Sequence, residues 1–186
     1  MPKPAPGSFG LCHVHGLVGL FITLGQRLAG DASPFGHAFL VLDNGQVLSG
    51  QPGGAIIEPL ADYLDRPDVV FSTLPALTPE QTAHVVAIGR LYEHEPYAFG
   101  SYLALALLAA GVRPQFLRRL VAHGSICSAL VDRVYASAGI HLFTDGRPFG
   151  FVTPGALDRY RRALPPDSPY DSVLDRLRGH LDLDPA

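Results

Sequence analysis

Two residues able to carry out covalent catalysis lie far apart in this chain, His37 and Cys127. Cys127 follows a loop of small residues, 123–126, and precedes the helical apolar pattern of residues 129–138. In the first turn of a helix, exposed N–H groups and the helix dipole stabilise a thiolate. The same N–H groups can bind the oxyanion of an acyl-transfer reaction. Such a thiolate needs an imidazole base on a separate rigid element.

His37 is the best placed of the eight histidines to act as that base. It precedes an apolar run, residues 38–42, that is typical of a strand. The Asn44-Gly45 step and a second extended run, residues 46–51, then indicate a β-hairpin. A third extended run, residues 55–57, follows a glycine-rich break. We therefore expect His37 at the end of a strand, directed at Cys127.

The group that orients the imidazole is expected on the second strand of this hairpin, which offers Ser49 and Gln51. Gln51 is favoured, because its amide can accept or donate a hydrogen bond to His37, and the shorter Ser49 is the alternative. A two-residue Asn-Gly loop and a bulged three-residue loop would turn these side chains to opposite faces. The sequence leaves both registers open.

The remaining patterns alternate between short strands and helices. Thr78 and Gln81 match a capping box, with Pro79 at the first helical position, so a helix is expected from there to about His94. Further strands are expected at residues 9–14 and 69–74. Other helices are expected at residues 16–28, 60–64, 97–110, 114–122, 129–138, 153–162 and 170–181. These elements predict an α+β fold, with a small antiparallel sheet flanked by helices.

The first of these helices carries an apolar stripe. Leu17, Leu20, Phe21 and Leu24 recur at i, i+3, i+4 and i+7. This spacing predicts a helix that packs these side chains on the core.

Length and composition indicate one globular unit. The chain has 186 residues, and domains commonly run to about 100–200 residues. We expect a proline-rich disordered tail at residues 1–8 and a single domain at residues 9–186. The net charge is −3, without a basic block, which argues against nucleic-acid partners.

No signal-peptide pattern opens the sequence. The longest apolar run, residues 102–112, is shorter than the roughly 18 residues of a membrane span. We therefore expect a soluble, cytoplasmic protein without an integral membrane segment. Its two cysteines form no disulfide framework.

Cys12, His13 and His15 offer a second cluster of reactive side chains. The two histidines would share one face of a strand, but structural zinc generally needs four protein ligands. Metal binding is therefore the weaker interpretation, and no metal or other cofactor is expected.

The segment GHAFLVLDNGQVLSGQPGGAII, followed much later by SICSALVDRVYASAGI, resembles the NlpC/P60 superfamily of papain-like cysteine hydrolases. Because the histidine hairpin precedes the cysteine helix, the order resembles that of the circularly permuted branch. That branch includes the permuted amidase-like enzymes and, more distantly, the lecithin–retinol acyltransferase group. The resemblance implies a permuted papain-like fold, with Cys127 as nucleophile and His37 as base. Tyr97, in EPYAFG, resembles the tyrosine that lies near the oxyanion site of family members.

The resemblance implies a cysteine hydrolase that cleaves amide or ester bonds through an acyl-enzyme. A thiol acyltransferase is the nearest alternative, because another acceptor can replace water in the second step. A catalytically silent binding domain with the same fold is the other alternative. The expected ligand is a small-molecule, peptide or acyl substrate, and neither its identity nor the oligomeric state follows from the sequence.

Overall fold

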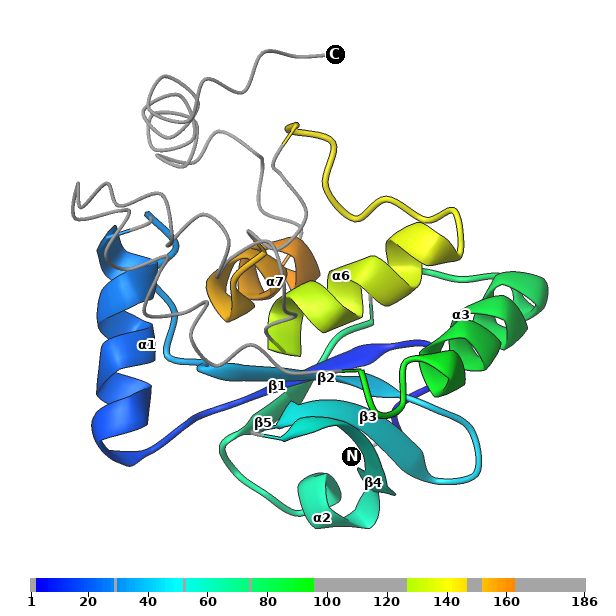
Figure 1. Ribbon diagram of the computed structural model, residues 1–186, viewed down its shortest axis with the longest axis horizontal. Helices are drawn as coiled ribbons and strands as arrows, with labels where there is room; N and C mark the ends of the chain where they lie inside the picture. Colours follow the sequence, from blue (N-terminus) through cyan, green and yellow to red (C-terminus); the bar gives the residue numbers. More distant parts are fainter. Residues whose placement is uncertain are drawn as a thin grey trace.

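The computed structural model describes residues 3–28, 30–51, 53–73, 75–95, 127–146 and 152–162. These residues form an α+β fold built on one five-stranded sheet with strand order β4-β3-β2-β1-β5. Every neighbouring pair of strands is antiparallel. Helices lie on both sides of the sheet, with α6 and α7 on one side and α2 on the other (Figure 1). The predicted fold class is confirmed at this level.

The strands are β1 (Phe9–Cys12), β2 (His37–Val41), β3 (Gln46–Gln51), β4 (Gly54–Pro59) and β5 (Val69–Phe71). The helices are α1 (Gly16–Leu28), α2 (Ala61–Leu64), α3 (Pro79–Leu91), α6 (Cys127–Ser137) and α7 (Pro154–Arg161). The predicted capping box is present at the start of α3, where Thr78 accepts from the Gln81 N–H. The helices expected at residues 97–110, 114–122 and 170–181 lie outside the described residues.

Both faces of the central strands are buried. Ala38 and Leu40 of β2, and Leu42 directly after it, belong to the larger core, which also contains apolar residues of α3, α6 and α7. Phe39 and Val41, which alternate with them, belong to a smaller core beneath α2. This alternation follows from the two-residue period of a strand. His37 has the parity of Phe39 and thus begins β2 on the strand face turned toward the smaller core.

The β2–β3 loop sets the register of the hairpin. Leu42 N–H donates to Gln46 O at 2.8 Å, which leaves residues 43–45 as a three-residue loop. Asn44 and Gly45 both have positive φ, 54° and 70°, which these two residue types tolerate. Phe39 therefore pairs with Ser49. Of the two registers left open by the sequence, the one with a three-residue loop is present.

The three leucines of the stripe predicted on α1 do not pack on the core. Leu17, Leu20 and Leu24 are 74%, 63% and 50% exposed. The buried side of α1 instead includes Ile22 and Gln26. The Gln26 side chain donates to Phe35 O at 2.9 Å and accepts from the Gly155 N–H at 2.6 Å. A polar anchor to α7 thus decides which face is buried, so the prediction from apolar spacing was wrong.

The tail predicted at residues 1–8 also differs from the structure over residues 3–8. Gly7 N–H donates to Val41 O at 2.8 Å, and Val41 N–H donates to Ser8 O at 2.7 Å. The Tyr135 hydroxyl of α6 donates to Gly7 O. These bonds satisfy backbone groups at the end of β2, which holds Gly7 and Ser8 in the core despite the proline-rich composition.

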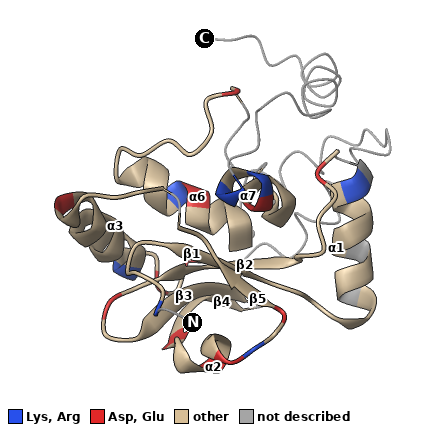
Figure 2. Cartoon of the chain, turned by 180° about the vertical axis from the view of Figure 1, so that it is seen from behind, with Lys and Arg blue, Asp and Glu red and all other residues tan. Residues whose placement is uncertain are grey.

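Acidic and basic residues are neighbours along α7 (Figure 2). Asp158 forms ion pairs with Arg161 and Arg162, both at 2.7 Å. Asp158 therefore partly balances the positive charges of Arg161 and Arg162 at the end of α7. Within the part of the chain that the structure describes, no helix is long and apolar enough to cross a membrane.

Candidate active site

The structure brings together the two residues singled out for covalent chemistry. His37 is the first residue of β2, and Cys127 is the first residue of α6, which packs against β2. The Cys127 side chain is hydrogen-bonded to His37. The neighbouring Ser128 is fully buried and donates to Val152 O at 2.6 Å, which holds the first turn of α6 in place. A thiol at a helix start thus meets an imidazole from a separate strand.

Ser49 lies against the other side of the imidazole. Its Oγ atom is 3.0 Å from His37 Nε2, and the Ser49 side chain is fully buried. Ser49 is directly opposite Phe39, so His37 is its diagonal neighbour on the same face of the hairpin. Because Nε2 is engaged with Ser49, Nδ1 is the ring nitrogen left for Cys127. The alternative orienting residue, and not the favoured one, therefore contacts His37.

Gln51 has a different partner. Its amide donates to both carboxylate oxygens of Glu58, each at 3.0 Å. The expectation that Gln51 holds His37 is therefore corrected. A hydrogen bond to an ionised acceptor is stronger than one to a neutral ring, so Glu58 competes successfully for this amide.

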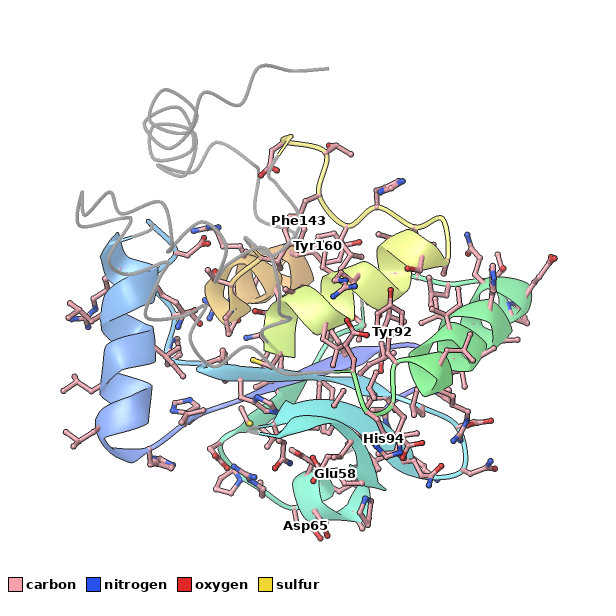
Figure 3. The ribbon with its side chains drawn as sticks, in the orientation of Figure 1. Glu58, Asp65, Tyr92, His94, Phe143 and Tyr160 are labelled. Carbon is pink, nitrogen blue, oxygen red and sulfur yellow. The ribbon has the colours of Figure 1, made fainter. Side chains whose placement is uncertain are left out.

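Two residues that the sequence did not single out extend the cluster. The Tyr63 hydroxyl of α2 donates to Glu58 Oε1 at 2.5 Å, and Ser49 acts on the same hydroxyl by favouring its ionised form. Figure 3 shows Glu58 on the side of the sheet that carries α2. A single carboxylate within the otherwise apolar strand 54–59 was the one available signal. Its partner Tyr63 could not be assigned without the position of α2.

The charges around His37 oppose one another. Burial disfavours the imidazolium, but the hydrogen bond and negative charge of Cys127, together with the charge of Glu58, outweigh it. Arg66 acts in the same direction as burial. The net effect raises the pKa of His37 above its ordinary value. This direction is the one expected where a thiolate and an imidazolium stabilise each other.

Cys12 is the second thiol near the imidazole, because it pairs with His37 across β1 and β2. Both cysteines are buried, with 4% of Cys12 and 1% of Cys127 exposed. Burial raises the pKa of Cys12 to about 12. Cys12 therefore stays a neutral thiol near neutral pH and behaves as part of the smaller core.

The other candidates do not add to this cluster. Tyr97 lies outside the described residues. The rings of His13 and His15 have centroids 6.4 Å apart. Among residues the structure describes, no three or more His, Cys, Asp or Glu side chains are grouped so that they could hold a metal ion.

The comparisons with known proteins give a fold relationship. No protein-family model matches the chain, and no curated protein matches it. The chain is similar to a crystal structure described as that of the metalloprotein yiiX from Escherichia coli O157:H7, DUF1105, with a TM-score of 0.53. The two chains are 17% identical, and the match covers 86% of this chain and 82% of that one. At this identity the similarity concerns the fold alone.

Proposed function

We propose that this protein is a cysteine hydrolase that cleaves amide or ester bonds, with Cys127 as nucleophile and His37 as base. The observation that carries the proposal is the contact of Cys127, at the start of α6, with an imidazole held on its other side by Ser49. A nucleophile, a base and an orienting group in this order constitute the minimal machinery of acyl transfer. The order of the histidine hairpin and cysteine helix supports assignment to the permuted branch of the NlpC/P60 superfamily.

The reaction proceeds in two steps. The Cys127 sulfur attacks the substrate carbonyl carbon, and the N–H groups of the first turn of α6 stabilise the oxyanion. His37, which holds the proton from the thiol, delivers it to the leaving amine or alcohol as the carbon–heteroatom bond breaks. A thioester on Cys127 remains. His37 then takes a proton from water, whose oxygen attacks the thioester, and the acid product leaves as the thiolate re-forms.

The similar structure is described as a metalloprotein, and we do not propose a metal for this chain. Cys12, His13 and His15 are the candidate ligands that lie together in the sequence, and two histidines with one buried thiol do not complete a zinc site. No step of the proposed reaction passes through a metal.

The test is trapping of the acyl-enzyme. We expect incubation with an activated ester, such as p-nitrophenyl acetate, to add one acyl group to Cys127, detected by peptide mass spectrometry. Cys127→Ala should abolish both the adduct and turnover, whereas Cys12→Ala, the matched control, should retain them. Turnover without an adduct at Cys127, or an adduct on Cys12 alone, would overturn the assignment.

A second measurement distinguishes the reaction classes. Product analysis with an added amine or lipid acceptor separates hydrolysis from acyl transfer, because a transferase would form the new amide or ester in preference to the acid. A wild-type protein that neither turns over nor becomes acylated would be a binding domain.

A further inference from the structure

A continuous series of polar contacts leads from the imidazole to a carboxylate on a different strand. His37 Nε2 contacts Ser49 Oγ at 3.0 Å, the Ser49 hydroxyl acts on the Tyr63 hydroxyl and favours its ionised form, and Tyr63 donates to Glu58 at 2.5 Å. Ser49 and Tyr63 are only 0% and 6% exposed, so water has little access to the middle of the series. We call these four residues the His37–Glu58 relay. Its four residues come from four different elements, β2, β3, α2 and β4.

The direction of donation along the relay follows from its two ends. A carboxylate can only accept, so the Tyr63 hydroxyl donates to Glu58. The single Tyr63 proton is then used, and Ser49 must donate to the Tyr63 oxygen. The Ser49 oxygen is left to accept, and the matching donor is a His37 Nε2–H, which both the imidazolium and one neutral tautomer carry. This arrangement fits a protonated His37 at one end and an ionised Glu58 at the other.

In the described part of the chain, hydrogen bonds and not an ion pair hold the Glu58 carboxylate. Within the described ranges, no arginine or lysine forms an ion pair with Glu58; Arg66, whose guanidinium lies over the Tyr63 ring, pairs instead with Asp68 at 2.7 Å. Gln51 donates to both Glu58 oxygens and so holds the carboxylate in place without a charge. The positive partner that the relay can reach is the imidazolium.

We infer that Glu58 and Tyr63 are positioning residues of the proposed Cys127–His37 pair, in which the relay fixes the ring orientation and favours protonated His37. The inference rests on the proposed function, with Glu58 acting through Ser49 and Tyr63 in place of the direct third residue expected from the sequence. Hydrogen bonds in such buried series polarise one another, so a distant charge can influence the ring.

Several groups act on His37 and must be separated in the test. Cys127 faces it from α6, Cys12 from β1, and Glu58 from β4 through the relay, while Arg66, which follows α2, opposes protonation. Glu58→Gln preserves a hydrogen-bond acceptor for Tyr63 but removes the charge. Tyr63→Phe preserves the charge but interrupts the relay. Asp62→Asn is the matched control, since it removes an exposed carboxylate from α2 beside Tyr63.

The experiment has two readouts on the full chain: the pKa of His37 by NMR of ring-labelled histidine, and the pH dependence of Cys127 alkylation by iodoacetamide. We expect both Glu58→Gln and Tyr63→Phe to lower the His37 pKa. At slightly acidic pH, alkylation of Cys127 should fall on the order of three- to tenfold, the equivalent of half to one pKa unit. Asp62→Asn should match wild type in both readouts.

Each result bears on one idea. If Glu58→Gln and Tyr63→Phe both give wild-type values in both readouts, the relay is overturned. The proposed function still stands in that case, provided that Cys127 of these proteins is reactive. A shift in Glu58→Gln without one in Tyr63→Phe would also overturn the relay, because the charge would then act directly through space. A wild-type Cys127 that is inert at acidic pH would count against the proposed function, and the His37 pKa would still decide the relay. Thermal unfolding identifies a variant that fails to fold, and the other variant then carries the test.

Discussion

At the residue scale, the His37 imidazole lies between a thiol and a hydroxyl, each of which uses one ring nitrogen. These two contacts prevent the ring from rotating. A base acts effectively only when its ring is held in one orientation. Ser49 supplies no charge of its own. Its contribution is orientation, and it passes on the influence of the groups behind it.

The two cysteines are expected to differ sharply in reactivity. The hydrogen bond and charge of Cys127 raise the pKa of His37 above its ordinary value, and a protonated His37 would in turn stabilise the proposed Cys127 thiolate. The pKa of Cys12 is raised to about 12, so that thiol ionises only in strongly alkaline solution. We expect iodoacetamide to label Cys127 first below neutral pH, as read by peptide mass spectrometry. Because both thiols are buried, faster labelling of Cys12 could not be attributed to exposure and would contradict this difference in ionisation.

Ser49→Ala should reduce turnover more than Gln51→Ala does. Loss of the Ser49 hydroxyl frees His37 Nε2 and interrupts the contacts to Tyr63, so kcat should fall, on the order of tenfold or more, with KM little changed. Gln51→Ala only loosens Glu58, and its effect should be smaller. Steady-state kinetics on one activated ester compare the two variants. A larger loss in Gln51→Ala would mean that the amide reaches the imidazole during catalysis.

At the element scale, close approach of β1 and β2 places the aromatic side chains beneath the sheet. Gly10 pairs with Phe39, and a Cβ atom at Gly10 would lie 2.2 Å from the end of the Phe39 ring. The ring of Phe39 in turn packs on Tyr63, with centroids 4.2 Å apart. A glycine in β1 therefore helps to hold α2, and with it the Tyr63 hydroxyl, at the sheet.

Gly10→Ala should destabilise the protein by about 1–3 kcal/mol, the usual range for overpacking a core. Phe39 is fully buried, so its ring cannot move aside into solvent. Urea unfolding measures the change, and the double variant Gly10→Ala/Phe39→Leu should recover part of the loss because the smaller side chain relieves the contact. If Gly10→Ala unfolds at the wild-type urea concentration, the close packing of these strands is not limiting.

At the scale of the whole molecule, segments more than a hundred residues apart are joined by buried polar groups. Asp31, fully buried in the loop between α1 and β2, forms an ion pair with Arg159 of α7 and accepts from Thr153 Oγ1 at 2.6 Å. Gln26 adds the bond to Gly155 described above. These contacts hold α7 near the loop that leads into His37.

Arg159→Met should lower the free energy of unfolding by about 3–5 kcal/mol, the range measured when one partner of a buried ion pair is removed. The buried Asp31 would then lack its counter-ion. Arg162→Met is the matched control: Arg162 is 47% exposed and Asp158 keeps Arg161, so about 0–1 kcal/mol is expected. Equal losses in the two variants, measured by denaturant unfolding, would argue against a special role of the Asp31–Arg159 pair.

The sequence by itself determined the features that depend on neighbouring residues. The Asn44-Gly45 turn, the Thr78 capping box and the place of Cys127 in the first turn of α6 all follow from local backbone preferences, and the structure contains each of them. Tertiary structure decided which of two locally acceptable outcomes was used. The buried face of α1 depends on Gln26 meeting Gly155, and the partner of His37 depends on Glu58 drawing Gln51 away. Both contacts join residues from different elements, so no pattern within a single element could reveal them.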